Sequence, residues 1–213
     1  ALPARDRADV LRRIAGLYED HAPEFFALTC REAGKTLLDG VGEVREAVDF
    51  LRFYAAEAER LEGAGAPRGV IACISPWNFP LAIFTGQIAA ALAAGNAVIA
   101  KPAEQTPLSI LYFADLMRQA GFPAGVLNIV NGLGRDAGQA LASHRGIDKI
   151  AFTGSTLTGR EIMKTAAVKL NNITLETGGK SPLLVFADAD IEQAAKWAYV
   201  GIMSNQGQVC TAT

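Results

Sequence analysis

The sequence contains few of the residues on which disulfide-rich, zinc-binding and nucleic-acid-binding proteins depend. It has three cysteines and two histidines in 213 residues, and no pair of them has the spacing of a zinc finger. An odd number of scattered cysteines argues against a disulfide framework and favours a reducing compartment. Twenty Lys and Arg against 22 Asp and Glu leave no basic surplus for nucleic acid or a membrane surface. No signal-peptide pattern opens the chain, so we expect a cytoplasmic protein without a metal site.

Charged side chains are missing from one long stretch, residues 70–100. A run of this length could span a bilayer on paper. Two prolines, two glycines and the polar residues Asn78, Gln87 and Asn96 interrupt it, however, and its many alanines are only modestly hydrophobic. We therefore interpret the stretch as a buried strand, a loop, a buried alanine-rich helix and a second buried strand, and predict no membrane span.

Hydrophobic periodicity divides the chain near residue 68. Before it, apolar residues recur at helical spacing, as at Val10, Leu11 and Ile14, which predicts helices. After it, short apolar runs alternate with helical segments. The predicted strands are residues 70–74, 97–100, 126–130, 149–152, 173–175 and 183–185, and the predicted helices are residues 85–94, 108–119, 136–143, 160–168 and 191–204. Uncharged strands that alternate with helices predict a parallel sheet covered on both faces, a doubly wound α/β fold.

A glycine-flanked turn follows the predicted strand at residues 149–152. Residues 154–159 read Gly-Ser-Thr-Leu-Thr-Gly and open a helix, so backbone N–H groups and the helix dipole could meet a phosphate there. The carboxyl end of a strand is where open α/β sheets bind ligands, although an ordinary strand-to-helix turn would have the same features. Residues 34–36 (Gly-Lys-Thr) do not form a P-loop, because Thr29 stands where its first glycine is required and a helix precedes them.

Polar residues also follow two other predicted strands. Residues 76–80 (Pro-Trp-Asn-Phe-Pro) place the Asn78 amide in a loop that two prolines fix. Lys101 and Glu104 come at the end of the next strand. Each feature also has a purely structural explanation: a rigid turn with Trp77 packed in the core, or a surface ion pair worth less than about 1 kcal/mol.

Cys210 differs from the other two cysteines in its surroundings. Most cysteines of cytosolic proteins are small, inert hydrophobes, and Cys30 and Cys73 fit that description. Cys210 instead ends a polar, glycine-containing segment, and Glu176 ends a predicted strand beside two glycines. Glu176 and Cys210 are therefore a candidate base and nucleophile, although the sequence alone does not place them in contact.

Together, five ordered motifs resemble the aldehyde dehydrogenase superfamily. They are residues 76–80 (PWNFP), 101–104 (KPAE), 152–155 (FTGS), 175–180 (LETGGK) and 206–210 (QGQVC). They occur in the family's order and near its spacings, and the match runs over essentially the whole chain. The resemblance implies a Rossmann-like cofactor domain at residues 1–178, with a helical amino-terminal segment at residues 1–62. Residues 179–213 would begin a truncated catalytic domain that carries the nucleophile.

The resemblance also implies catalytic roles for three residues. Cys210 would add to the aldehyde carbon as a thiolate. The Asn78 amide and the backbone N–H of Cys210 would form the oxyanion hole, and Glu176 would activate the water that hydrolyses the thioester. The implied function is NAD-dependent oxidation of an aldehyde to a carboxylate. A CoA-acylating reaction is disfavoured, because thioester transfer to CoA needs no water-activating base.

A further set of residues is implied in cofactor binding. They are Trp77, Lys101, Glu104, Gly134, Gly154, Ser155, Thr156 and Gly159. The turn at residues 154–159 would meet the pyrophosphate, Lys101 and Glu104 would hold the adenosine ribose, and Trp77 and Gly134 would line the dinucleotide site. A carboxylate accepts hydrogen bonds from ribose hydroxyls and repels a 2′-phosphate. NAD is therefore favoured over NADP, although some members with this glutamate use both.

The sequence departs from the family pattern in two places. It stops three residues after Cys210, at roughly half the family's usual length, and the link between Leu61 and Gly69 is short. The alternative function is therefore a catalytically incomplete fragment that only binds a dinucleotide. Residues 1–107 most resemble the glutamate-semialdehyde dehydrogenase module of proline-catabolic enzymes, and residues 108–213 resemble aliphatic or retinal-type enzymes. The expected partners are a small aldehyde and, for a full-length form, further copies of the chain.

Overall fold

Three helices form the amino-terminal part of the chain in the computed structural model, which describes residues 2–212. They are α1 (Ala4–Asp20), α2 (Ala22–Ala33) and α3 (Leu37–Arg60). Their apolar faces bury residues such as Ile14, Tyr18 and Leu51, as the helical periodicity predicts.

A tight turn separates α2 from α3. Gly34 ends α2 in the left-handed region, at φ 66°, which a glycine adopts without strain. Thr36 caps α3: its hydroxyl accepts a hydrogen bond from the N–H of Asp39, and the Asp39 carboxylate accepts one from the N–H of Thr36. Lys35 lies between these two fixed residues and is buried.

The rest of the fold is built on a five-stranded parallel sheet. Its strands are β1 (Val70–Ile74), β2 (Ala97–Lys101), β3 (Leu127–Ile129), β4 (Lys149–Gly154) and β5 (Asn172–Thr177). They lie side by side in the order β3-β2-β1-β4-β5. The chain therefore runs outward from β1 in one direction and then crosses to continue from β1 in the other. In open α/β sheets, ligands bind at this switch point, outside the carboxyl ends of the strands.

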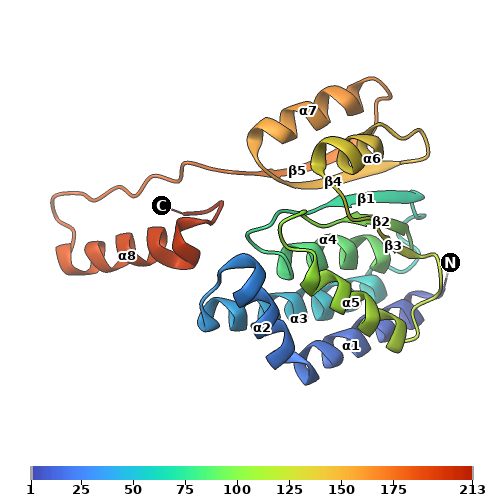
Figure 1. Cartoon of the computed structure of the whole chain (residues 1–213), viewed down its shortest axis with the longest axis horizontal. Helices are drawn as coiled ribbons and strands as arrows, with labels where there is room; N and C mark the ends of the chain where they lie inside the picture. The colour runs from blue at the N-terminus through green and yellow to red at the C-terminus, as the bar shows by residue number, and fades with distance from the viewer. Residues whose placement is uncertain (1, 213) are drawn as a thin grey trace.

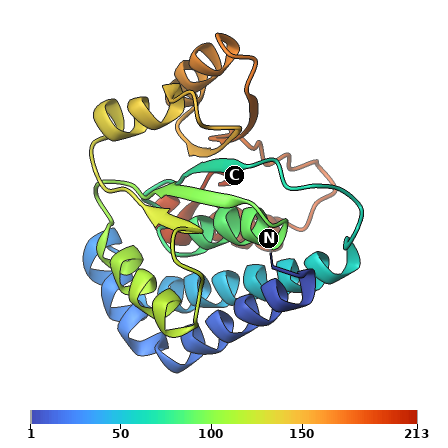
Figure 2. The same ribbon diagram turned by 90° about the vertical axis from the view of Figure 1, so that its right-hand side faces the viewer.

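Helices cover both faces of the sheet (Figures 1 and 2). On one side, α4 (Ala82–Ala93) and α5 (Leu108–Gln119) lie together with α1 and α3. On the other lie the π-helical turn η1 (Gly134–Gly138), α6 (Gln139–Ser143) and α7 (Thr156–Ala167). Alternate residues of β1 serve the two cores: Ile71 and Cys73 belong to the first, and Ala72 and Ile74 to the second. The structure thus confirms the doubly wound α/β fold.

The uncharged stretch at residues 70–100 forms β1, α4 and β2, as predicted. The α4 helix within it has only 12 residues. Within the described part of the chain, no helix is both long and apolar enough to cross a membrane.

The prediction of a strand at residues 183–185 is wrong. After β5 the chain runs away from the sheet as an extended segment (Figure 1). Among residues 2–212, no strand pairs with residues 183–185. Leu183, Leu184 and Val185 are all exposed. An apolar run forms a strand only where a neighbouring strand can accept and donate its backbone hydrogen bonds. The segment leads to α8 (Ile191–Met203) and the short helix η2 (Ser204–Gly207).

Candidate active site

The loop that carries Asn78 joins the end of β1 to the start of α4. The side chain of Asn78 reaches the segment that follows α8: its Nδ2 donates a hydrogen bond to the carbonyl oxygen of Gln208, at 2.7 Å. The neighbouring Trp77 is 37% exposed. It therefore does not pack in the core, as the structural explanation of this loop would require.

The segment that carries Cys210 has an unusual backbone. Asn205 and Gln206 both adopt left-handed conformations, at φ 47° and φ 54°, and Gly207 follows at φ 73°. Two consecutive residues of this kind, neither of them glycine, are uncommon and strained. Cys210 is exposed. It lies two residues after Gln208, whose carbonyl oxygen accepts the hydrogen bond from Asn78.

Glu176 lies on the edge strand β5, beside Thr153 of β4, and its side chain is exposed. The backbone near it approaches the cysteine, because the N–H of Gly179 donates to the carbonyl oxygen of Cys210 at 3.2 Å. A side chain at position 179 would crowd that carbonyl, since its Cβ would lie 3.0 Å from the oxygen. Within residues 2–212, no hydrogen bond joins the Cys210 thiol itself to Asn78 or to Glu176. The structure thus joins these three parts of the chain through hydrogen bonds to the backbone carbonyls of Gln208 and Cys210, not through the thiol.

The turn after β4 has the features of an anion-binding helix N-terminus. Ser155 caps α7, and its Oγ accepts a hydrogen bond from the N–H of Thr158 at 3.1 Å. The N–H groups of Thr156 and Leu157 also lie in the first turn of α7, where donors have no partner within the helix. Gly154 is required sterically, because a Cβ there would lie 2.6 Å from Cζ of Phe152.

Gly159, at the other end of this turn, lets α7 approach β5. A Cβ at that position would lie 3.1 Å from Cγ2 of Thr177, which is tighter than most contacts between side chains. The two glycines of the motif therefore have different roles: one shapes the turn, and the other allows the helix to pack closely on the sheet.

Lys101, Glu104 and Gly134 form a second cluster at the carboxyl ends of the strands. The Lys101 side chain is only 3% exposed, and its ammonium donates to the carbonyl of Pro102 at 3.0 Å and to the Glu104 carboxylate at 3.3 Å. The N–H of Gly134 donates to the other carboxylate oxygen at 3.4 Å. Desolvation raises the pKa of Glu104, but the N–H groups of Glu104 and Gly134 and the Lys101 charge outweigh it and keep the pKa below its ordinary value.

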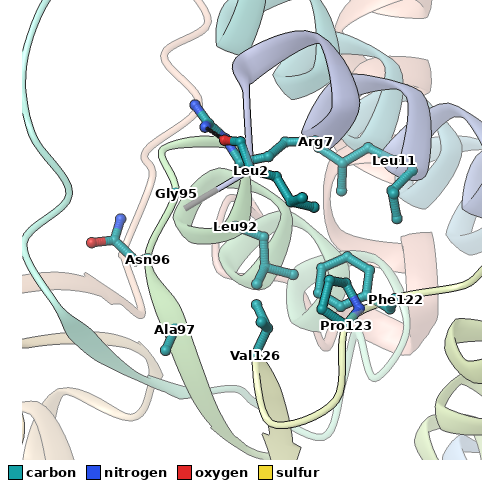
Figure 3. Close-up of a pocket in the computed structure, with 11 residues that line it drawn as sticks. Leu2, Arg7, Leu11, Leu92, Gly95, Asn96, Ala97, Phe122, Pro123 and Val126 are labelled. Carbon is teal, nitrogen blue, oxygen red and sulfur yellow. Dashed lines mark hydrogen bonds between the residues drawn. The ribbon is translucent and has the colours of Figure 1, made fainter.

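A cavity of about 370 Å³ opens at the opposite edge of the sheet (Figure 3). Leu11, Leu92, Phe122 and Val126 contribute its apolar wall. It lies at the amino end of the strands, since Ala97 begins β2 and Val126 precedes β3. A dinucleotide site is expected at the carboxyl ends, so this cavity is not a candidate for it.

Comparison with known proteins identifies the family. The model of the aldehyde dehydrogenase family matches residues 1–213. The chain belongs to this family. An aldehyde dehydrogenase-like protein of Schizosaccharomyces pombe is 47% identical in an alignment 225 positions long, which covers 99% of this chain and 45% of that protein. Retinal dehydrogenase 2 of Mus musculus is 44% identical, over 99% of this chain and 44% of its own.

Solved structures of aldehyde dehydrogenases have the same fold. The NAD+ complex of the aldehyde dehydrogenase from Bacillus cereus superposes with a TM-score of 0.95 at 41% identity, over 99% of this chain and 46% of that chain. An E. coli NADP-dependent enzyme superposes equally well at 38% identity, over 100% and 47%. The chain thus spans about half the length of the aldehyde dehydrogenases that it matches. Family membership confirms the resemblance that the five motifs indicate.

Sequence reasoning missed three buried polar residues that contact the candidate site of this aldehyde dehydrogenase chain. They are Lys35, Glu43 and Asn205. Glu43 could have been found, because it lies on the apolar face of α3 between Gly40 and Ala47, and a carboxylate in that position needs a buried partner. Nothing in the sequence indicates that the partner is Lys35, or that Asn205 joins them.

Proposed function

We propose that this chain is the cofactor-binding and nucleophile-bearing part of an NAD-dependent aldehyde dehydrogenase that oxidises an aldehyde to a carboxylate. The observation that carries the proposal is the 2.7 Å hydrogen bond from Asn78 to Gln208. It joins the loop after β1 to the segment of Cys210 at the carboxyl edge of the sheet. We place the boundary between the cofactor domain (1–178) and the catalytic segment (179–213) just after β5 ends at Thr177.

In the first step, the Cys210 thiolate attacks the aldehyde carbon. A carbon–sulfur bond forms, and the π electrons of the carbonyl move to its oxygen. An asparagine amide has two N–H donors. One of those of Asn78 binds Gln208, which leaves the other for the oxyanion together with the backbone N–H of Cys210. Such donors act where charge develops in the transition state.

When bound, NAD would supply the acceptor for the hydride that the former aldehyde carbon must lose. The carbonyl re-forms as a Cys210 thioester. Glu176 takes a proton from water, the resulting hydroxide adds to the thioester, and the carbon–sulfur bond breaks to release the carboxylic acid and the Cys210 thiolate. The acid then gives its proton to the solvent and leaves as the carboxylate. The exposed position of Glu176 suits a base that must reach water.

The residues present fit a dinucleotide at two points. The first turn of α7 offers free N–H groups and a positive dipole to a pyrophosphate. The Glu104 carboxylate, which has a lowered pKa, offers acceptors to ribose hydroxyls, and Trp77 and Gly134 would line the site between them. A carboxylate at the ribose also repels a 2′-phosphate, and this favours NAD. The E. coli relative is NADP-dependent, so both cofactors belong in the assay.

A second function, dinucleotide binding without turnover, is favoured by the region after β5. None of the residues of α8 is buried, and Phe186, Trp197 and Tyr199 are each exposed by more than 60%. A substrate site walled by protein needs apolar surfaces that are covered.

We also propose that the full-length protein is a cytoplasmic homo-oligomer. The three free cysteines support a reducing compartment.

One experiment separates these functions. The chain is mixed with NAD and a short aliphatic aldehyde or glutamate semialdehyde, and both NADH production and NAD binding are measured. Turnover that Cys210→Ser abolishes supports the enzyme, whereas NAD binding without NADH supports the binding module. In an active protein, Glu176→Gln should give a rapid burst of NADH followed by slow turnover, because hydride transfer precedes the step that needs the base. Loss of the burst itself would contradict the role of Glu176 in hydrolysis.

A further inference from the structure

A buried ion pair lies beneath the candidate site. Nζ of Lys35 is 3.0 Å from Oε1 of Glu43, and the two side chains are 1% and 0% exposed. Lys35 comes from the turn between α2 and α3, and Glu43 from the buried face of α3. Burial raises the pKa of Glu43, against the opposing effects of Lys35 and of the N–H groups of Ala82 and Leu81.

Glu43 holds the end of the Asn78 loop. Its second oxygen, Oε2, accepts hydrogen bonds from the N–H groups of Leu81 at 3.1 Å and of Ala82 at 2.7 Å. These are among the donors at the start of α4 that have no partner within the helix. The Lys35 ammonium also lies 4.4 Å from the ring centre of Phe79, within the range of a cation–π interaction. The ion pair therefore fixes the chain directly after Asn78.

Lys35 also holds the segment of Cys210. Its ammonium donates to Oδ1 of Asn205 at 2.8 Å. Because an ammonium can only donate, the Asn205 oxygen must face Lys35 and its NH₂ group must point away. That group donates to the carbonyl oxygens of Asn78 and Gln208, each at 3.2 Å.

The same turn makes one more contact with the segment. Nε2 of Gln206 donates to the carbonyl oxygen of Gly34 at 3.1 Å. The contacts of Lys35 and Gly34 thus reach two successive left-handed residues, Asn205 and Gln206. Both ends of the Asn78–Gln208 hydrogen bond are consequently tied to the turn between α2 and α3.

Stability alone is a poor explanation for this arrangement. Two charges lose their hydration on burial, and well-packed apolar residues in their place are often as stabilising or more so. An apolar pair, however, could neither bind the N–H groups of α4 nor orient the amide of Asn205. The ion pair instead fixes the position of the Asn78 loop relative to the Cys210 segment.

We propose that Lys35 and Glu43, acting through Asn205, are positioning residues that set the Cys210 segment against the Asn78 loop. The inference rests on the proposed function only in taking Cys210 as the nucleophile. Neither residue touches the substrate. Their effect is to hold the carbonyl of Gln208, and with it the backbone N–H of Cys210, where the oxyanion hole requires it.

The test uses a double variant, Lys35→Met with Glu43→Gln, in the whole chain. It removes both charges at nearly constant volume, so no charge is left buried without a partner. The amide oxygen introduced at position 43 can still accept from the start of α4, but Asn205 loses its cationic donor. The matched control is Arg12→Met with Glu59→Gln, which removes an exposed ion pair between α1 and α3.

Two measurements report on the segment without requiring turnover. Amide hydrogen exchange follows the N–H groups of Gly179 and Gln208, which donate to Cys210 and Asn205. The rate of Cys210 alkylation, measured across pH and located by peptide mapping, follows the environment of the thiol. The double variant loses the hydrogen bond from the Lys35 ammonium to Asn205. This loss should raise the exchange rate ~10- to 100-fold at these two amides and change the dependence of the Cys210 alkylation rate on pH. Exchange in α1 should not change.

Unchanged exchange and alkylation in the double variant would overturn the proposal. Equal acceleration throughout the chain would overturn it too, because that pattern indicates only a loss of global stability. The control variant should match the wild type in both measurements. Failure of the proposed function appears elsewhere: the wild type itself would then produce no NADH, whatever the exchange data show.

Discussion

Ser155→Ala should destabilise the protein more than Ser155→Asp does, whereas Ser155→Asp should weaken NAD binding more than Ser155→Ala does. Ser155→Ala removes the hydroxyl that accepts from Thr158, and loss of such a cap lowers the free energy of unfolding by about 1 kcal/mol. Ser155→Asp keeps an acceptor at the same position, and its charge interacts favourably with the N-terminus of α7. The Asp variant should therefore be about as stable as the wild type, and the Ala variant less stable.

For NAD binding the order should reverse. A carboxylate ~5 Å from a bound pyrophosphate repels it by about 1–3 kcal/mol for an effective dielectric constant between 80 and 20. This corresponds to roughly 5- to 150-fold weaker binding. Ser155→Ala loses at most one neutral hydrogen bond, about 0.5–1.5 kcal/mol, or ~2- to 10-fold. Aspartate should thus be the more harmful of the two in binding, although it is the less harmful in folding.

Calorimetric titration with NAD measures the affinities, and urea denaturation without NAD measures the stabilities. The difference between Asp and the wild type should shrink as salt is added, because salt screens the repulsion. An Asp variant that binds NAD as tightly as the wild type would refute the assignment of the pyrophosphate to the first turn of α7. Parallel losses of stability and affinity in both variants would also refute it.

Three further outcomes are expected. Gly154→Ala should lower the free energy of unfolding by about 1–3 kcal/mol in urea denaturation and weaken NAD binding, because its Cβ would lie 2.6 Å from Cζ of Phe152. Burial raises the pKa of Cys73 from 9.0 to about 12. The native thiol should therefore resist alkylation at pH 9 until denaturant is added, and its contribution to stability, complete below pH 9, should be lost as the pH rises to about 12. Tyr18→Phe should cost about 1–2 kcal/mol in urea denaturation, because it leaves the buried hydroxyl of Thr85 without the partner now 2.8 Å away.

The strands at the centre of the sheet could be predicted closely because they are covered on both sides. The apolar run at Val70–Ile74 coincides with β1, and three later runs differ from β2, β3 and β4 by one or two residues. Burial on both faces makes such strands continuously apolar, so the signal is local. The exposed run at residues 183–185 is also entirely apolar, and an apolar composition alone cannot show that a partner strand is missing.

The first residues of α4 and α7 were predicted less accurately, and the physical reason differs between these two helices. α4 begins at Ala82 rather than at the predicted residue 85, because Glu43, 39 residues away, accepts from its N-terminal N–H groups. α7 begins at Thr156 rather than at residue 160, because Ser155 caps it locally. The second start could have been found from the sequence, whereas the first depends on a tertiary contact.

The same distinction separates the parts of the candidate site. Asn78, Lys101 and Glu104 follow strands, and the carboxyl ends of parallel strands meet at one edge, so their common location could be predicted. Lys35 and Asn205 are 170 residues apart. Their contact depends on the path of the chain after β5, which local pattern does not determine.

The contacts made by the buried ion pair and its turn explain how the strained backbone before Cys210 is stabilised. A residue in a sparsely populated conformation costs of order 1–3 kcal/mol and persists only where its surroundings over-determine it. Asparagine tolerates the left-handed region better than glutamine does. The side chain of Asn205 is buried and makes three hydrogen bonds, whereas Gln206 is exposed and its side chain bonds to Gly34. Three of the four groups that bind these two side chains lie outside their own segment. The turn between α2 and α3 is therefore part of what gives the Cys210 segment its shape, although it lies far from Cys210 in the sequence.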